Sequence, residues 1–504
     1  MSVDTNNAEF QDALDLIQYT RQSVFLTGKA GTGKSTFLRY VCEHTKKKHV
    51  VLAPTGIAAI NAGGSTMHSF FKLPFYPLLP DDPNLSLQRG RIHEFFKYTK
   101  PHRKLLEQIE LVIIDEISMV RADIIDAIDR ILRVYSHNLR EPFGGKQLLL
   151  VGDVFQLEPV VKNDEREILN RFYPTPYFFS ARVFGQIDLV SIELQKVYRQ
   201  TDPVFVSVLD HIRTNTAGAA DLQLLNTRYG SQIEESEADM YITLATRRDT
   251  VDSINEKKLA ELPGEPITFE GVIEGDFPES SLPTSQELVL KPGAQIIFIK
   301  NDFDRRWVNG TIGVIAGIDE EEETIYVITD DGKECDVKRE SWCNIRYRYN
   351  EKTKEIEEEV LGSFTQYPIR LAWAITVHKS QGLTFSRVVI DFTGGVFAGG
   401  QAYVALSRCT SLDGIQLKKP INRADIFVRP EIVNFAGRFN NRQAIDKALK
   451  QAQADVQYAA AARAFNKGDM EECLEQFFRA IHSRYDIEKP VPRRLIRRKL
   501  GIIN

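Results

Sequence analysis

The segment Gly28–Ser35 constrains the fold of this chain more than any other. Its sequence, Gly-Lys-Ala-Gly-Thr-Gly-Lys-Ser, matches the phosphate-binding loop pattern Gly-x4-Gly-Lys-Ser/Thr. An apolar stretch, Ser23–Thr27, precedes the segment, and a helical pattern, Thr36–His44, follows it. Because a strand, a glycine-rich turn and a helix in this order are typical of doubly wound α/β folds, the segment predicts a parallel sheet with ligands at the carboxyl ends of its strands.

The chemistry of this loop predicts ATP and Mg²⁺ as ligands. Its glycines let successive backbone N–H groups surround phosphate oxygens, and the start of the following helix adds a favourable positive potential. We expect Lys34 to reach the β- and γ-phosphates and the Ser35 hydroxyl to bind Mg²⁺. The residues expected to bind the nucleotide are Gly28, Ala30, Gly31, Thr32, Gly33, Lys34, Ser35 and Thr36.

Three further apolar stretches continue the predicted sheet. They are Val50–Ala53, Leu111–Ile114 and Gln147–Val151. The acidic pair Asp115-Glu116 follows the second of them. We expect Asp115 to hold Mg²⁺ through water and Glu116 to orient and deprotonate the attacking water.

The third stretch leads into Gly152–Pro159, where Gln156 would lie beside Asp115. A glutamine at this place can hydrogen-bond the γ-phosphate or the attacking water, and so respond to hydrolysis. An ordinary strand-to-loop turn explains the same residues equally well. Gln156 is therefore a candidate catalytic residue on the strength of its place in the predicted sheet.

The rest of the chain has a second α/β pattern with insertions and a helical end. A Pro- and aromatic-rich segment, 65–102, interrupts the first pattern, and short alternating strands separated by Pro-Gly, Asn-Gly and Asp-Gly in 263–360 predict a small β-barrel. The strands expected there are Leu288–Lys300, Thr311–Ile318, Thr324–Asp330 and Glu334–Lys338. The second α/β pattern comprises a strand at Met240–Ala245, a helix at Ile369–Ser380, a strand at Arg387–Asp391 and a helix at Gln401–Ser407.

The C-terminal 70 or so residues are expected to be helical. Ala454–Phe465 and Met470–His482 form a predicted helix hairpin, similar to one tetratricopeptide-type unit. Because a single unit cannot bury its own apolar face, we expect this hairpin to pack against the body. A short basic run, Arg493 to Lys499, follows it and is either an ordinary solvated tail or a nucleic-acid contact.

Composition limits the classes of function. The formal net charge is −5, so a nucleic-acid partner would need a local basic groove rather than a basic surface. The five cysteines form no CxxC pair, which argues against a zinc site or a disulfide framework. No stretch is apolar over the roughly 18 residues of a membrane span, and no signal or transit sequence is recognisable, so we expect a cytoplasmic protein, nucleoid-associated if bacterial.

These motifs, taken in order with several others, resemble the superfamily 1 helicases. The others are Ala53–Ala59, Gly64–His68, Val197–Gln200, Leu244–Arg248, Thr376–Gly382 and Tyr403–Arg408. The segments Ser118–Asp123 and Phe143–Gln147 resemble the signature between the second and third motifs of the petite-integration-frequency (PIF) helicases, which are RecD-like members of group B. The resemblance extends over roughly residues 5 to 430.

The resemblance implies an α/β fold with two RecA-like domains that bind ATP between them. The implied division is 1–64 with 103–186 for the first domain, 65–102 for a wedge insertion, 187–262 with 361–430 for the second domain, 263–360 for an SH3-like barrel, and 431–504 for a helical extension. The implied activity is 5′-to-3′ translocation on single-stranded DNA and unwinding of duplexes, forks, RNA–DNA hybrids and G-quadruplexes, in repair, replication, recombination or telomere maintenance. The free protein is expected to be monomeric.

The resemblance also assigns residues. Arg199 and Arg408 would act as arginine fingers, although surface ion pairs would explain them too, and Gln381 and Gly382 would line the same cleft. Gln11 is either the adenine-binding glutamine or a glutamine on a helix surface. The implied DNA contacts are Thr55, Thr66 and His68 in the first domain and Thr246, Thr376, His378 and Lys379 in the second. The aromatic side chains of Phe70, Phe71, Phe75 and Tyr76 would either stack on bases or form the core of the insertion.

Three other functions remain open at this point. A RecD-like motor subunit of a recombination nuclease shares these motifs, and so does an RNA-directed helicase of the same superfamily. A binding scaffold with an inactive phosphate loop is disfavoured by the intact candidate residues. Unwinding assays on DNA and RNA tracking strands separate the first two from a DNA helicase.

Overall fold

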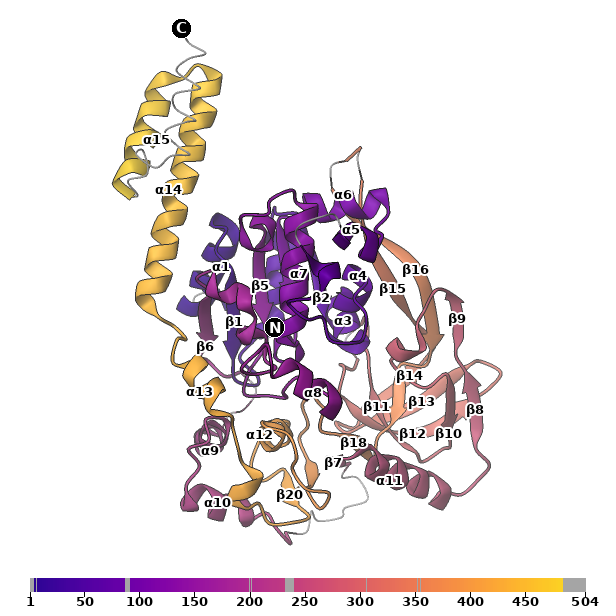
Figure 1. Cartoon of the computed structure of the whole chain (residues 1–504). Coiled ribbons are helices and arrows are strands. Elements are labelled where there is room, and N and C mark those ends of the chain that lie inside the picture. The colour runs from indigo at the N-terminus through magenta and orange to yellow at the C-terminus, as the bar shows by residue number, and fades with distance from the viewer. Residues whose placement is uncertain are drawn as a thin grey trace.

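The computed structural model describes residues 4–5, 7–86, 91–198, 200, 202–231, 240–304, 306–350, 352–353 and 355–483. Two parallel sheets lie in two lobes, and an antiparallel β region lies beside both of them (Figure 1). A pair of long helices extends from the opposite side of the first lobe (Figure 1). This arrangement is an α/β fold with two parallel-sheet lobes, as the resemblance implies.

The first lobe is built on a six-stranded parallel sheet in the order β3-β2-β4-β5-β1-β6. The strands are β1 (Val24–Gly28), β2 (His49–Ala53), β3 (Ser65–Thr66), β4 (Leu111–Ile114), β5 (Gln147–Val151) and β6 (Val190–Leu194). Its main helices are α1 (Ala8–Tyr19), α2 (Lys34–His44), α3 (Gly56–Ala62), α6 (Lys100–Gln108) and α7 (Ala122–Tyr135). The four strands expected here are confirmed to within a residue or two, because continuous apolar runs mark strands that are buried on both faces.

The segment 65–102 begins inside this sheet. Ser65–Thr66 pairs with β2, and the chain then forms α4 (Met67–Phe71), the short helix η1 (Pro83–Leu85) and α5 (Arg91–Phe96). Phe70 and Phe71 are buried in the core of the first lobe, whereas Phe75 and Tyr76 are exposed.

The second lobe contains a four-stranded parallel sheet in the order β18-β7-β19-β20. The strands are β7 (Ile242–Ala245), β18 (Ala374–Thr376), β19 (Val388–Asp391) and β20 (Ile415–Leu417). Its helices are α9 (Pro203–Arg213), α10 (Ala219–Asn226), α11 (Arg248–Glu261) and α12 (Gln401–Leu406).

The helix predicted at Ile369–Ser380 is wrong. This segment forms β17 (Ile369–Leu371) and β18, followed by a turn from Val377 to Gly382. β17 pairs with the antiparallel sheet and β18 with β7, so each finds a neighbouring strand that a helix could not offer. A short apolar run does not distinguish a strand from a buried helix by its periodicity.

The antiparallel region contains two sheets and a strand pair. A five-stranded sheet, β14-β13-β12-β11-β17, has its own core around Trp307, and β8 pairs with β10 beside it. The strands are β8 (Ile267–Glu270), β10 (Glu287–Leu290), β11 (Gln295–Phe298), β12 (Ile312–Asp319), β13 (Thr324–Thr329) and β14 (Glu334–Val337). The strand expected at Leu288–Lys300 is divided into β10 and β11, because the chain turns at Pro292-Gly293.

A long hairpin joins this region to the first lobe. It consists of β15 (Glu340–Tyr349) and β16 (Ile356–Gln366), with β9 (Val272–Gly275) at its edge. Tyr347 and Tyr349 are buried in the core of the first lobe, and the Tyr347 hydroxyl accepts a hydrogen bond from the Val51 N–H at 3.3 Å. The sequence analysis did not anticipate this hairpin.

The C-terminal helices extend away from the body. After α13 (Pro430–Ala436), the helix α14 (Arg442–Lys467) packs its first turns on α1 through Ile445 and Ala448, and α15 (Met470–Ser483) packs on the outer half of α14 (Figure 1). Because Ile445 and Ala448 precede the predicted hairpin, the expectation that the hairpin packs against the body is wrong. None of the described helices combines the length and hydropathy that a membrane span requires. The basic run at 493–499 lies outside the described residues.

Candidate nucleotide-binding site

The phosphate-binding loop joins β1 to α2 as the sequence predicts. Gly33 precedes α2 in the left-handed region, with φ of 90°. A Cβ atom on Gly28 would come within 2.5 Å of the Thr32 Oγ1 and 2.9 Å of the Leu194 carbonyl oxygen, so only glycine fits there. The Lys34 ammonium donates to the carbonyl oxygens of Gly28 at 2.6 Å and Lys29 at 3.0 Å.

The acidic pair follows β4 directly. The Asp115 carboxylate accepts a hydrogen bond from the Glu116 N–H at 2.9 Å, and Glu116 takes a left-handed conformation with φ of 50°. Burial, and then the negative charge of Asp115, raise the pKa of Glu116 to about 7, against the opposing effects of Lys34 and Arg408. Burial also raises the pKa of Asp115. A carboxyl group with this pKa is suited to act as a general base near neutral pH.

The donor set suits Mg²⁺. A hydroxyl at Ser35 and a carboxylate at Asp115 are hard oxygen ligands, and Mg²⁺ commonly takes one or two carboxylates and completes its shell with phosphates and water. Within the described part of the chain, no group of three or more His, Cys, Asp or Glu side chains forms a metal cluster. The residues therefore fit an ion that binds together with a nucleotide.

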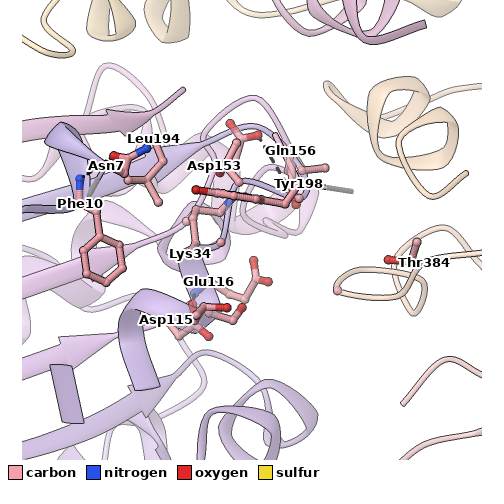
Figure 2. Close-up of a pocket in the computed structure, with 18 of the residues that line it drawn as sticks. Asn7, Phe10, Lys34, Asp115, Glu116, Asp153, Gln156, Leu194, Tyr198 and Thr384 are labelled. Atoms are coloured by element: carbon pink, nitrogen blue, oxygen red, sulfur yellow. Dashed lines mark hydrogen bonds between the residues drawn. The ribbon is translucent and has the colours of Figure 1, made fainter. Parts of the chain in front are cut away.

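A cavity of about 570 Å³ is lined by residues of both lobes (Figure 2). From the first lobe it is lined by Lys34, Ser35, Thr36, Asp115, Glu116, Asp153 and Gln156, among others. From the second lobe it is lined by Gly382, Thr384 and Arg408. In Figure 2, Lys34 and the acidic pair lie on one side of the open space and Thr384 lies across from them.

Arg408 is held rigidly at the wall of this cavity. Its side chain is almost wholly buried, with 1% of the residue surface exposed. The guanidinium donates to the carbonyl oxygens of Val404 at 3.0 Å, Leu383 at 3.2 Å and Ser380 at 3.3 Å, and to the Ser407 hydroxyl at 3.0 Å. These four contacts hold the guanidinium in place.

Gln156 lies in the cavity wall close to Asp153. Its amide nitrogen is 3.4 Å from a carboxylate oxygen of Asp153, and both residues are nearly fully buried. Asp153 in turn binds Arg213, the last residue of α9, at 3.0 Å. Arg213 also pairs with Glu193 at 2.7 Å, and its guanidinium lies 4.4 Å from the centre of the Phe155 ring. This buried cation therefore ties the Gln156 loop of the first lobe to a helix of the second.

The sequence analysis missed other contacts between the lobes. The Tyr403 hydroxyl accepts a hydrogen bond from the Ala30 N–H of the phosphate-binding loop at 3.0 Å, and Lys29 of the same loop pairs with Asp210 of α9. A Cβ atom on Gly400 would come within 2.3 Å of the Gln156 carbonyl oxygen. Tyr403 and Gly400 belong to or adjoin the motif that contains Arg408, which is the only sequence signal that could have indicated them.

Three residues predicted to contact the nucleotide are not among the described residues that line the cavity. Gln11 donates to the Thr5 carbonyl oxygen at 3.0 Å, whereas Asn7 and Phe10 of the same region line the cavity. The side-chain amide nitrogen of Gln381 is buried and has no hydrogen-bond partner among the described residues, which suits a ligand contact. Arg199 lies outside the described residues. The roles of these residues remain predictions.

The predicted DNA contacts lie at the carboxyl ends of strands in both lobes. Thr55 follows β2 and caps α3, where its hydroxyl accepts a hydrogen bond from the Ala58 N–H at 3.2 Å. Thr66 ends β3 and caps α4, where its hydroxyl accepts from the Ser69 N–H at 3.1 Å. The His68 ring stacks on Phe75, with centroids 5.0 Å apart and planes 9° apart.

In the second lobe, the predicted contacts occupy the matching edge. Thr246 follows β7, and Thr376 ends β18. His378 and Lys379 lie in the turn after β18, where the Thr376 hydroxyl accepts from the Lys379 N–H at 3.2 Å. Each lobe therefore presents its set of candidate residues at one sheet edge.

The chain is similar to known helicases over most of its length. A model of the PIF1-like helicase family matches residues 6–215. The chain is 31% identical over 443 residues to the ATP-dependent DNA helicase Pif1 of Bdellovibrio bacteriovorus, covering 86% of this chain and 91% of that protein. It is 33% identical over 412 residues to Pif1 of Campylobacter jejuni, covering 78% and 88%.

Solved structures of similar proteins differ in how closely they match. Pif1 of Bacteroides sp in complex with ADP-AlF4 is 41% identical, with a TM-score of 0.79 and coverage of 87% of this chain and 97% of that one. The TM-score with this chain is 0.77 for the unliganded Bacteroides protein and 0.62 for its complex with single-stranded DNA, and each is 41% identical to this chain.

Two lobes with parallel sheets, a phosphate-binding loop in one and a buried arginine from the other define a P-loop ATPase of the helicase class. The comparisons narrow this class, because relatives at 31% identity or more span most of this chain and of their own length. The chain belongs to the PIF1-like helicase family, and it is an enzyme, an ATP-dependent DNA helicase.

Proposed function

We propose that this helicase moves 5′ to 3′ on single-stranded DNA and unwinds duplexes by hydrolysing ATP between its two lobes. The observation that carries the proposal is the single cavity lined by Lys34 and Glu116 of the first lobe and Arg408 of the second. A nucleotide bound there would contact both lobes, so its hydrolysis would change how they are held together.

The residues of the cavity divide the chemistry among them. Lys34 binds the β- and γ-phosphates, exchanging its contacts with the loop carbonyl oxygens for phosphate oxygens. Ser35 and Asp115 would hold Mg²⁺, which supplies positive charge at the phosphates when bound. Glu116 takes the proton of the attacking water, and Gln156 orients that water.

Arg408, together with Arg199, neutralises the charge that spreads over the transferring phosphoryl group. Because Arg408 is already fixed by backbone contacts, little reorganisation is needed when the nucleotide binds. Loss of the γ-phosphate removes the group that bridges Lys34 and the arginines, and the lobes are then free to separate.

The DNA track follows the carboxyl-end edges of both sheets. Hydroxyls at Thr55, Thr66 and Thr376 suit sequence-independent contact with phosphates. Phe75 is 82% exposed and stacks on His68 on one face only, so its other face is available to a base. The lower TM-score of the DNA-bound Bacteroides protein supports a lobe arrangement that differs when DNA is present.

The proposal includes the division of the chain. The segment 65–102 acts at the duplex junction, 263–360 is an SH3-like barrel, and 431–504 is an extension of the motor core. Forks, G-quadruplexes and RNA–DNA hybrids are the proposed substrates, and the free protein is proposed to be monomeric.

Strand displacement on matched duplexes with a 5′ or a 3′ single-stranded overhang tests the proposal. We expect ATP-dependent displacement from the 5′ overhang by the isolated chain, which also argues against a motor subunit that needs a nuclease partner. Displacement only from the 3′ overhang would refute the polarity. A matched substrate with an RNA tracking strand separates DNA from RNA translocation.

A further inference from the structure

Arg370 is a cation with no counter-charge in the part of the chain that the structure describes. It lies in the middle of β17, between Ile369 and Leu371, and its backbone is opposite Ile297 of β11. Ile369 and Leu371 pack in or against the core around Trp307, so the alternation of the strand directs Arg370 to the other face. Among the described residues, the guanidinium of Arg370 has no hydrogen-bond or ion-pair partner.

The protein around Arg370 makes this charge costly. Burial alone lowers the pKa of Arg370 to about 10, although the residue keeps some exposed surface. A buried charge is normally paired, because removing it from water without a partner is strongly unfavourable. An unpaired guanidinium at the edge of the surface therefore indicates a place for an anion from outside the chain.

Lys379, in the turn after β18, is a second cation within electrostatic reach of Arg370. Burial, and then the positive charges of Arg370 and Arg248, lower the pKa of Lys379, while the negative charge of Asp252 raises it. Arg248 itself pairs with Asp252 at 3.4 Å. Arg248 begins α11, which packs along β18 through hydrogen bonds of 2.9 Å between Asn255 and the backbone of Ala374. This packing brings the start of α11 to the same sheet edge as the turn that contains Lys379.

The start of α11 adds donors to the cluster. Its capping residue, Arg247, makes no side-chain hydrogen bond to the first turn of the helix, whereas Asp249 in that turn accepts a hydrogen bond from the Thr250 N–H at 2.9 Å. Backbone N–H groups at such a helix start favour phosphate, and α11 is 14 residues long. Arg370, Lys379 and the start of α11 therefore offer both charge and hydrogen-bond donors to one anion.

We propose that Arg370 and Lys379, with the start of α11, bind a backbone phosphate of the tracking strand of nucleic acid. The inference rests on the proposed function, since it adds a phosphate-binding site to the DNA track of the second lobe. Lys379 was a candidate from the sequence, whereas Arg370 was not. Arg370 lies in the strand that leads from the antiparallel region into the second lobe, so this phosphate-binding site would link that region to the DNA track.

The salt dependence of binding tests the proposal directly. For single strands, each neutralised phosphate contributes about 0.7 to the slope of log K against log salt. We expect R370Q to weaken the binding of an oligothymidylate by about tenfold at low salt and to reduce the slope by about one contact. R370K should keep most of the slope, because it retains the charge.

Thermal stability separates this role from a structural one. Because Arg370 is unpaired and repelled by Lys379, R370Q should melt at the same temperature as the parent protein or higher when no DNA is present. R346Q is the matched control, since Arg346 is exposed and paired with Glu359 at 2.7 Å, and it should leave affinity and slope unchanged.

Three results would overturn the proposal. They are an unchanged slope and affinity in R370Q, an equal change in R346Q, and a lower melting temperature in R370Q without a change in slope. The wild-type polarity assay stays interpretable in each case, so failure of this inference is distinguishable from failure of the proposed function.

Discussion

Removing the Arg213 cation should destabilise the protein strongly, because it lies between two carboxylates inside the contact of the two lobes. The side chains of Arg213 and Asp153 are 3% and 0% exposed, and that of Glu193 is 14% exposed. Breaking a buried pair by removing one partner costs about 3–5 kcal/mol, since the remaining charge stays buried. We expect Arg213→Met, which keeps an apolar stem over Phe155, to lose an amount in this range.

Urea denaturation followed by circular dichroism measures this loss. Arg429→Met is the matched control, because Arg429 pairs with Glu158 of the neighbouring loop at 2.7 Å but is 37% exposed, so it should cost about 1 kcal/mol or less. The double variant R213M/D153N should recover part of the loss, because it removes one of the two carboxylates that R213M leaves unpaired. A loss below about 1 kcal/mol in R213M, or one equal to that of R429M, would refute the reasoning.

Three further predictions concern catalysis and the DNA track. Because Glu116 must be deprotonated to act as a base and its pKa is raised to about 7, kcat/KM for ATP should rise with pH through about 7 and then level off; a flat profile from pH 5.5 to 8.5 contradicts this role. Gly400→Ala should lower kcat for ATP by about tenfold or more while nucleotide affinity changes little, because the new Cβ would displace the Gln156 loop. Gly399→Ala is the control in the same steady-state assay and should be neutral, because a Cβ atom there would lie 3.7 Å from its nearest neighbour. Phe75→Ala should weaken single-stranded DNA binding by about 1–3 kcal/mol in fluorescence anisotropy, and an unchanged affinity would exclude base stacking by this ring.

The sequence predicted the elements whose chemistry is local. The phosphate-binding loop, the strands before it and the acidic pair follow from short patterns, because glycine geometry and continuous apolar runs act over a few residues. The helix predicted at Ile369–Ser380 failed because its two strands are stabilised by partners far along the chain, β11 and β7.

The contacts between lobes were not predictable in this way. Arg213 and Tyr403 act through residues about 60 and 370 positions away, Asp153 and Ala30. Tyr403 lies in the motif that contains Arg408, but the motif does not say which residue its hydroxyl contacts. That the Arg370 side chain has no partner among the described residues is likewise visible only in the folded structure. The helix α15 was predicted almost to the residue, but its projection from the body was not, because the rule that a helix hairpin must bury its apolar face does not say where the hairpin lies.

The central claim is that a buried arginine of the second lobe completes an ATP site of the first, and Arg408→Lys tests it most directly. Lysine keeps the charge but cannot reproduce the forked geometry of the guanidinium, and an arginine finger contributes about 10³–10⁵ to kcat. We predict that R408K binds a fluorescent nucleotide with nearly wild-type affinity and loses at least about 10³-fold in DNA-stimulated hydrolysis. Hydrolysis at the wild-type rate by folded R408K would contradict the account.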